Sequence, residues 1–279
     1  MYAALKNKKN EELNRVNNLI LNSLSLELVE LKEFLSDFLI SNSKKLRPLF
    51  IFYICDLLKI KLTDDVFNMA CAIELLHSAS LIHDDILDNG QIRRSKPCIH
   101  LKYGNKTAVL AGDYVLTLAM EFVSKFKNNK CMEILSQAGM KMTKSELMSL
   151  DMRFKKPSLE FYIQTLKEKT STLFIASIEC LEEISNKKID FKIYEFAENF
   201  SLCFQLKDDI SNYLNEDVNK ISSDEKEGIY TLPVILNSYG IIDNGRSFLN
   251  DLVLKTEQII SDYSNSKDLK ELTKCLRVK

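Results

Sequence analysis

Five aspartates in two short clusters are the residues of this sequence with the clearest capacity for chemistry. Asp84, Asp85 and Asp88 form the first cluster, and Asp208 and Asp209 form the second. On a helix, Asp84 and Asp88 lie one turn apart on the same face. Acids at the end of an apolar helix repel one another and lose solvation, a penalty that a hard cation removes. The clusters therefore predict Mg²⁺ ligands, with a solvated helix end as the alternative for either cluster alone.

The sequence also supplies cations that could bind phosphate, and two of them, Arg93 and Arg94, follow the first cluster closely. A magnesium ion held by few carboxylates keeps open positions for substrate phosphates. Any one of these cations alone is typical of a solvated surface, but with the acids they indicate a site for a diphosphate–metal complex. In chain order they are Lys44, Lys45, Arg47, Arg93, Arg94, Lys106 (after Asn105) and Lys169 (before Thr170).

His77 stands seven residues before Asp84. At about 100° per residue, seven steps return to nearly the same helix face, so His77 is predicted to point toward the metal site. The alternative is a histidine satisfied within the core. His83 and His100 lack this register, and the sequence has no zinc-ligand spacing, P-loop, GxGxxG or GxSxG motif.

Long helices are predicted to position these groups. Glycine (7) and proline (4) are scarce, and apolar residues follow helical periodicity. Two segments, 66–87 and 194–214, are apolar nearly all round and end in the acids, as expected of buried helices. The fold class is therefore all-α. The predicted helices span residues 9–24, 27–41, 46–59, 64–89, 106–126, 129–151, 158–184, 190–214, 229–240 and 246–276.

Bulk composition narrows the class of protein. A length of 279 residues without a compositional break favours one domain over 1–279. A net charge of −1 gives no basic field for nucleic acid. The polar amino terminus and the interrupted apolar runs predict neither a signal peptide nor a transmembrane segment. Seven scattered cysteines without a CxxC pair suit free thiols, so a cytoplasmic location is expected.

The motifs resemble those of the trans-type (E) polyprenyl diphosphate synthase family, long-chain members included. The stretch from Glu74 to Arg94 is similar to that family's first aspartate-rich motif region. The likeness keeps its order from about residue 44 to residue 235. The other matching segments are Gly104–Lys106, Leu110–Tyr114, Lys169-Thr170, Phe204–Asp209 and Gly228–Pro233.

The resemblance implies a helical bundle around a deep central cavity, usually a homodimer. It implies a reaction in which an allylic diphosphate and isopentenyl diphosphate condense in successive 1'-4 head-to-tail steps. It also implies two or three Mg²⁺ ions per site, and transient membrane contact for product release is left open. The implied metal and catalytic residues are Asp84, Asp85, Asp88, Asp208 and Asp209, with Lys169 also catalytic. The implied allylic-diphosphate residues are Arg93, Lys169, Thr170 and Gln205, and those for isopentenyl diphosphate are Lys44, Arg47, His77 and Arg94.

The sequence departs from the family pattern at four places. Two glycines usually precede Lys44, where this chain has Asn42 and Ser43. Ser149 replaces a common glutamine, Asn212 replaces a third aspartate, and Ile229 replaces a lysine. These departures leave open an alternative, in which the chain is a catalytically weakened subunit of a heteromeric synthase.

Product length is predicted from small residues one turn before the first cluster. Ala79 and Ser80 would line the top of a tunnel for the growing chain, and short-chain relatives commonly carry an aromatic residue there. A medium or long all-trans product is therefore expected. The alternative product is that of a farnesyl or geranylgeranyl synthase. The alternative role of Ala79 and Ser80 is close helix packing alone. Met120, Phe122 and Met132 are candidates for the tunnel floor, and the sequence does not choose among them.

Overall fold

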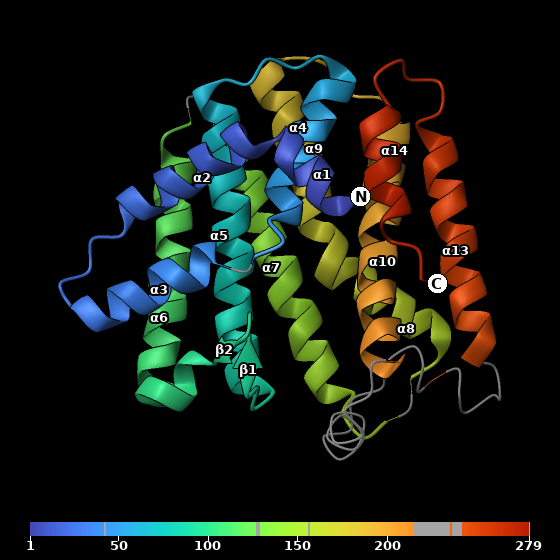
Figure 1. Ribbon diagram of the computed structural model, residues 1–279. Coiled ribbons are helices and arrows are strands. Elements are labelled where there is room, and N and C mark those ends of the chain that lie inside the picture. Colours follow the sequence, from blue (N-terminus) through green and yellow to red (C-terminus); the bar gives the residue numbers. More distant parts are fainter. Residues whose placement is uncertain (42, 127–128, 156, 215–234, 236–241, 279) are drawn as a thin grey trace. The chain divides into compact units, whose positions relative to one another are not determined.

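The computed structural model describes residues 1–41, 43–126, 129–155, 157–214, 235 and 242–278, and these residues are helical almost throughout (Figure 1). The all-α prediction is confirmed. Two short strands, β1 (Ile92–Arg93) and β2 (Lys96–Pro97), form an antiparallel hairpin. The helices are α1 (Tyr2–Lys8), α2 (Asn10–Ser23), α3 (Val29–Ile40), α4 (Leu46–Leu58), α5 (Asp64–Leu87), α6 (Ile99–Ser124), α7 (Asn129–Asp151), α8 (Leu159–Leu166), the π-helix η1 (Lys167–Ser171), α9 (Thr172–Ser185), α10 (Phe191–Leu214), α13 (Ile242–Ile259) and α14 (Lys267–Lys274).

The chain divides into two compact units. The N-terminal unit contains Lys6–Glu133 and Glu179–Asn186, and the C-terminal unit contains Met1–Leu5, Ile134–Ile178 and Lys187–Lys279. The single domain expected over 1–279 stays a prediction, because the division describes the packing inside each unit only.

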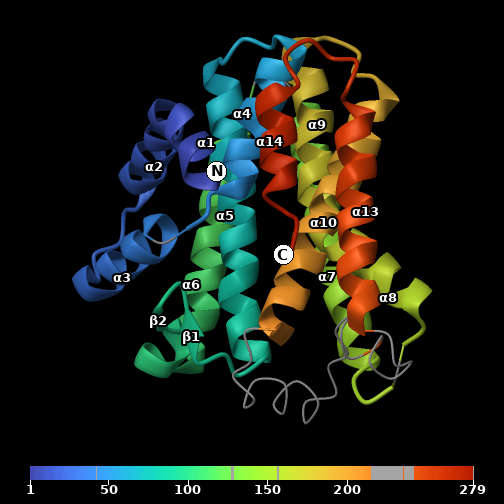
Figure 2. The ribbon, with the colours of Figure 1, turned by 45° about the vertical axis from the view of Figure 1, so that its right-hand side comes forward.

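The core of the N-terminal unit is built on α4 and α5. In α4, Phe50 and Phe52 are fully buried, and α5 buries nearly every residue from Val66 to Leu76. Each fully buried Val, Leu, Ile, Phe or Met side chain among them stabilises the fold by roughly 1.5–3 kcal/mol. Helices α5 and α6 lie side by side in both ribbon views (Figures 1 and 2). A Cβ at Gly112 of α6 would lie 2.2 Å from His83 Nε2, so any larger residue there would displace the His83 ring.

The start of α6 differs from the prediction. A helical turn from Ile99 precedes a break at Gly104, where φ is 80° and ψ is 160°, and the regular helix after the break corresponds to the predicted helix 106–126. Only glycine adopts such a backbone readily. The hairpin β1–β2 connects α5 to α6, and it was not predicted because two-residue strands leave no periodic signal.

The C-terminal unit packs α10 against α13 and against η1. Phe174, Phe196 and Phe200 form an aromatic cluster. The ring centroid of Phe200 lies 5.7 Å from that of Phe174 and 5.8 Å from that of Phe196. The predicted helix 158–184 is in fact three elements, because η1 interrupts it between α8 and α9. The predicted helix 229–240 lies outside the described residues except for Ile235.

Candidate functional site

The first aspartate cluster lies in the last turn of α5. Asp85 is buried, with 3% of its surface exposed, whereas Asp84 and Asp88 are partly exposed. Asp85 Oδ1 accepts hydrogen bonds from Arg93 Nε at 2.8 Å and from Arg93 Nη2 at 2.6 Å. Burial lowers the pKa of Arg93, but its bonds to Asp85 outweigh burial, so the pKa is raised overall. Arg93 therefore stays protonated beside Asp85.

A sharp turn after α5 brings Arg93 back beside the helix. Asn89 adopts a left-handed backbone (φ 47°), and the amide of Gly90 donates to the carbonyl of Asp85 at 2.9 Å. A Cβ at Gly90 would lie 3.2 Å from Asp85 Oδ1, closer than most side chains tolerate. The turn thus presses the chain against Asp85 and directs β1 toward it.

Four cations lie near enough to His77 to act on its charge, whereas its register with Asp84 predicted that it points toward the metal site, which stays a prediction. Burial lowers the pKa of His77 well below its ordinary value, and the charges of Arg47, Arg94, Arg93 and Lys45 lower it further. The imidazole is therefore neutral at neutral pH. A neutral donor among several cations is a surface prepared to receive a polyanion.

The structure differs from the expectation at the start of α4. Lys44, which was assigned to substrate, is exposed, whereas the next residue, Lys45, is buried at 3% exposure. Arg47 is also buried, at 8%. It is thus Lys45, and not Lys44, whose charge accompanies that of Arg47 near His77.

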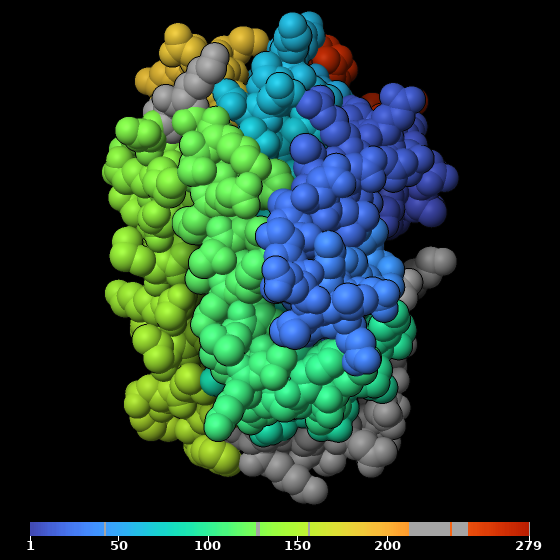
Figure 3. Space-filling model, turned by 90° about the vertical axis from the view of Figure 1, so that its left-hand side faces the viewer, coloured from blue at the N-terminus to red at the C-terminus, as the bar shows by residue number. Residues whose placement is uncertain are grey.

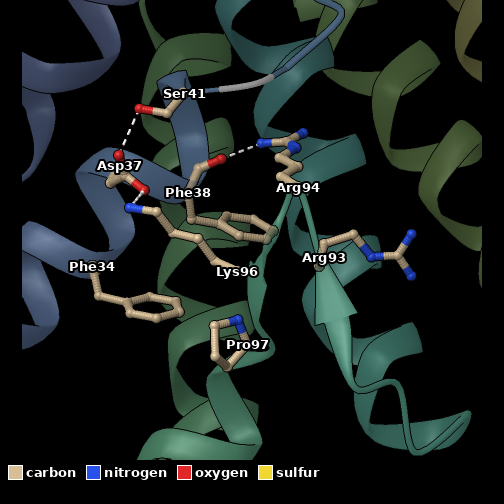
Figure 4. Close-up of a pocket in the computed structure, with 8 residues that line it drawn as sticks. All are labelled: Phe34, Asp37, Phe38, Ser41, Arg93, Arg94, Lys96 and Pro97. Atoms are coloured by element: carbon tan, nitrogen blue, oxygen red, sulfur yellow. Dashed lines mark hydrogen bonds and ion pairs between the residues drawn. The ribbon is translucent and has the colours of Figure 1, made fainter.

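Arg94 contributes to a small pocket between α3 and the hairpin (Figure 4). Its Nη1 donates to the carbonyl of Phe38, and its guanidinium lies 4.8 Å from the centroid of the Phe38 ring. Lys96 of β2 forms an ion pair with Asp37 of α3, the helix that also carries Phe38. Figure 4 shows Arg93 turned away from Phe38, so the two neighbouring arginines serve different surroundings.

In the C-terminal unit, a series of hydrogen bonds connects three of the predicted site residues. Thr170 Oγ1 donates to Gln205 Oε1 at 3.3 Å, and Gln205 Nε2 donates to Asp209 Oδ1 at 2.9 Å. The hydroxyl of Tyr162 donates to the second oxygen of Asp209. These hydrogen bonds hold the carboxylate of Asp209 in place, while Asp208 beside it is partly exposed.

Lys169 projects from the π-helix η1, which interrupts the regular turn of α8 and α9. Its Nζ lies 2.5 Å from Glu146 Oε2 of α7. Single π-helical turns inside α-helices are frequent at functional sites. Lys169 therefore has both a special backbone position and a partly buried acidic partner.

The donor groups suit a hard divalent cation. Among the described residues, no three acidic, histidine or cysteine side chains already converge as metal ligands. Mg²⁺ does not require such a cage, since it binds through one or two carboxylates and fills its other positions with water and phosphate oxygens. The partly exposed Asp84, Asp88 and Asp208 fit this mode of binding.

Several residues in these groups were not found from the sequence. Glu74, Glu146 and Tyr162 hold predicted site residues, and only the three-dimensional packing reveals them. In contrast, Asn105 and Lys106 are exposed on α6. The segment Gly228–Pro233, including Ile229, and the side chain of Asn212 lie outside the described residues.

A sequence profile of the family described as "Polyprenyl synthetase" matches residues 29–272. A short chain isoprenyl diphosphate synthase from Methanocaldococcus jannaschii is 33% identical over 71% of this chain and 63% of its own length, a little under two thirds. A geranylgeranyl diphosphate synthase from Saccharolobus solfataricus is 33% identical over 81% of this chain and 72% of its own. Heptaprenyl diphosphate synthase component 2 from Bacillus subtilis is 30% identical over 70% of this chain and 58% of its own.

Two solved structures share the fold. A decaprenyl diphosphate synthase from Rhodobacter capsulatus superposes with a TM-score of 0.87 at 21% identity, covering 99% of this chain and 98% of its own. A polyprenyl synthase from Caulobacter crescentus, complexed with calcium and isoprenyl diphosphate, gives 0.86 at 24% identity, covering 99% and 97%. At these identities the likeness establishes the fold.

Proposed function

Because the chain belongs to the polyprenyl synthetase family, we propose that it condenses an allylic diphosphate with isopentenyl diphosphate and releases diphosphate. One observation carries the proposal: helix α5 and the elements around it combine an acidic end with a separate group of cations around His77. An acidic end suits a diphosphate that arrives with metal, and the cations suit a diphosphate that arrives without it. The synthase names of the relatives support the same class of reaction.

Isopentenyl diphosphate binds to the cation group of the N-terminal unit. Arg47 and Arg94 supply planar donors for the phosphate oxygens, and the neutral ring of His77 adds another N–H. Lys44 is exposed and reaches this group only after its side chain turns inward. The hydrogen bond from Arg94 to Phe38 must be exchanged for one to substrate.

The allylic diphosphate binds with Mg²⁺ to the aspartate clusters. Bound metal supplies charge neutralisation for the leaving diphosphate. Calcium and isoprenyl diphosphate in the related Caulobacter protein support a divalent cation, and Mg²⁺, at two or three per site, is our assignment. The residues assigned to metal and allylic diphosphate are Asp84, Asp85, Asp88, Asp208, Asp209, Arg93, Lys169, Thr170 and Gln205.

The chemistry follows from charge separation. The allylic C–O bond breaks, its electron pair leaves with the diphosphate, and Arg93 and Lys169 stabilise the charge that develops there. The isopentenyl double bond, held beside the resulting allylic cation, attacks it and forms the new carbon–carbon bond. A proton then leaves the adjacent carbon for the departing diphosphate. Repeated steps lengthen the chain.

The product is a medium or long all-trans polyprenyl diphosphate. Ala79 is buried at 3% exposure and Ser80 is partly buried, one turn before Asp84. Small side chains at this depth leave room for a growing tail to continue past the first turn. The relatives include both short-chain and heptaprenyl synthases, so a farnesyl or geranylgeranyl product is the alternative that the test must separate.

A second candidate is a subunit that needs a different partner chain. The relative named heptaprenyl diphosphate synthase component 2 favours it, because that name implies more than one component. Ser149, Asn212 and Ile229 depart from the family pattern. Loss of a carboxylate at 212 and of a lysine at 229 would weaken the binding of Mg²⁺ and diphosphate. The acids and cations of α5 and its neighbours are nevertheless present in this chain, which favours an active synthase.

The active form is a homodimer that pairs through α6. This helix is apolar enough by length and composition to cross a membrane, yet only 44% of its most apolar window is buried, compared with 72% for α5. Leu101, Val109, Leu110 and Leu116 are exposed along it. A second copy would cover them without a membrane-spanning segment. A cytoplasmic location also remains a prediction, compatible with seven free cysteines.

Mg²⁺-dependent turnover is the direct test. The purified chain is assayed with isopentenyl diphosphate and a panel of allylic primers, with and without Mg²⁺, and the products are separated by length. Asp84→Ala and Asp208→Ala should each lower kcat by a factor of about 10³ or more, since each removes transition-state stabilisation of several kcal/mol.

The controls separate chemistry from folding. Both variants should keep the thermal midpoint of the parent, because acids that repel one another without metal do not stabilise the fold. Asp251→Ala, at an exposed position of α13, should leave turnover unchanged. Near-normal turnover in Asp84→Ala would refute the metal assignment, and activity only after a second chain is added would support the subunit alternative.

A further inference from the structure

A buried ion pair lies beneath the cation group of the N-terminal unit. Lys45 Nζ lies 3.4 Å from Glu74 Oε1, and the two side chains are 2% and 3% exposed. Lys45 Nζ also donates to the carbonyl of Leu39 at 2.6 Å. Because desolvation offsets the attraction of a buried pair, such a pair adds little net stability, and its presence calls for another role.

Ser43 extends the pair into a network. Its hydroxyl donates to Glu74 Oε1 at 3.1 Å and accepts from the backbone amide of Lys45 at 3.2 Å. Its carbonyl accepts from Lys6 Nζ at 2.9 Å. Glycine, which the family pattern has here, lacks this hydroxyl. The departure at residue 43 therefore adds a hydrogen bond to Glu74.

The network holds a strained turn at the start of α4. Lys45 adopts a left-handed backbone, with φ 51° and ψ 36°, which side-chain-bearing residues seldom adopt. Arg47 follows two residues later, inside the first turn of the helix. The conformation at Lys45 thus determines the direction in which Arg47 leaves the backbone, and Glu74 holds that conformation through the Lys45 ammonium and the Ser43 hydroxyl.

Glu74 also lies one turn before His77 on α5. Burial lowers the pKa of Lys45, and the charge of Arg94 lowers it too, whereas Glu74 opposes both. Burial also lowers the pKa of Arg94, and the same carboxylate opposes that shift. Glu74 is therefore a buried acid that offsets the repulsion among these cations before any anion binds.

We infer that Glu74 and Lys45 are positioning residues for isopentenyl diphosphate. Their ion pair fixes Arg47 beside His77 and Arg94, so that the diphosphate meets a group of donors already in place. The inference rests on the proposed function. It assigns no contact with the reacting atoms to either residue.

The test compares the two substrates in steady-state kinetics. Glu74→Gln keeps the size of the side chain and removes its charge. It should raise KM for isopentenyl diphosphate on the order of tenfold, as expected from misplaced binding groups. KM for the allylic diphosphate and kcat at saturation should change by less than about twofold. Asp56→Asn, which breaks the Lys9–Asp56 pair in the same unit (2.9 Å), is the matched control and should change neither KM.

A double variant separates positioning from stability. Lys45→Met with Glu74→Leu replaces the pair by apolar side chains of similar volume, which often preserves stability. It should melt near the parent temperature and still show the raised KM for isopentenyl diphosphate. Direct calorimetric titration with isopentenyl diphosphate alone should show the same loss of affinity.

The outcomes distinguish the two proposals. A parent chain that is inactive with every primer, alone and with partner chains, contradicts the proposed function. An active parent whose Glu74→Gln variant keeps its KM for isopentenyl diphosphate overturns the inference. Equal rises in both KM values also overturn it, since they indicate general loosening of the fold.

Discussion

At the residue level, the cations of the candidate site are held by acids of their own unit. Arg93 pairs with Asp85, Lys45 with Glu74, and Lys169 with Glu146. Such pairs keep groups of like charge together until a substrate or metal arrives. Binding must then exchange one partner for another, so affinity depends on the acids as much as on the cations.

His77 makes this balance measurable through pH. Its pKa in the folded chain is well below the ordinary value of 6.5, because of burial and of the cations near it. Between the folded pKa and 6.5, the unfolded chain binds a proton at His77 that the folded chain does not. The free energy of unfolding therefore falls as pH falls below about 6.5, with a slope of at most about 1.4 kcal/mol per pH unit from this residue.

The measurement compares urea unfolding of the parent and His77→Gln at pH 8 and at pH 5.5. Other groups titrate in both proteins, so the difference between the two curves isolates His77. The parent should lose more stability than the variant on acidification. Parallel pH profiles would contradict the depressed pKa.

Single site residues could be predicted where their role depends on neighbours close in the sequence. The register between His77 and Asp84 is a property of one helix and could be read from the sequence, whereas the cations that act on His77 come from several elements. The choice between Lys44 and Lys45 depends on the left-handed turn and on Glu74, which is 29 residues from Lys45 in the sequence. Periodicity carries no information on such a contact, so the buried lysine was not singled out.

At the level of elements, helices with continuous apolar faces were predicted well and their interruptions were not. Helix α5 was expected over 64–89 and spans Asp64–Leu87. The π-helix Lys167–Ser171 was missed inside the predicted helix 158–184. It occurs in a strongly periodic segment, where side-chain packing and not local preference decides which carbonyl each amide bonds. The helical turn before Gly104 was also missed, because it lies outside the predicted helix 106–126. These irregular turns carry or adjoin the residues assigned to substrate.

Helix α5 also sets the prediction on product length. If the growing chain runs along it, Ala79→Tyr should shorten the product by at least one isoprene unit while the first condensation continues. Ser80→Phe, at a partly exposed position, should act in the same direction with less risk to folding. Product lengths are compared by chromatography, and thermal melting checks that both variants are folded. Folded variants with the parent's product distribution would show that the tail does not pass these residues.

At the level of the whole molecule, the family and the all-α fold were predictable, because both depend on motifs and periodicity that survive at low identity. A TM-score of 0.87 at 21% identity to the Rhodobacter structure shows how little of the sequence the fold requires. The surface of α6 was not predicted. Figure 3 shows this helix as a column at the surface, and its exposed leucines belong to no core of the N-terminal unit.

Dimerisation is the prediction that belongs to this surface. Leu110 is 67% exposed and Val109 is 43% exposed on α6. In a two-fold symmetric dimer each substitution acts twice, once from each copy. Leu110→Glu removes two buried leucines from the interface, at roughly 1.5–3 kcal/mol each, and should weaken the dimer at least about a hundredfold. Leu254→Glu, at a residue of α13 that is 46% exposed, is the matched control and should leave the dimer intact. Sedimentation equilibrium of the parent and both variants measures the effect. A parent that is an active monomer, or a Leu110→Glu variant that remains as dimeric as the parent, would show that α6 is not where two copies meet.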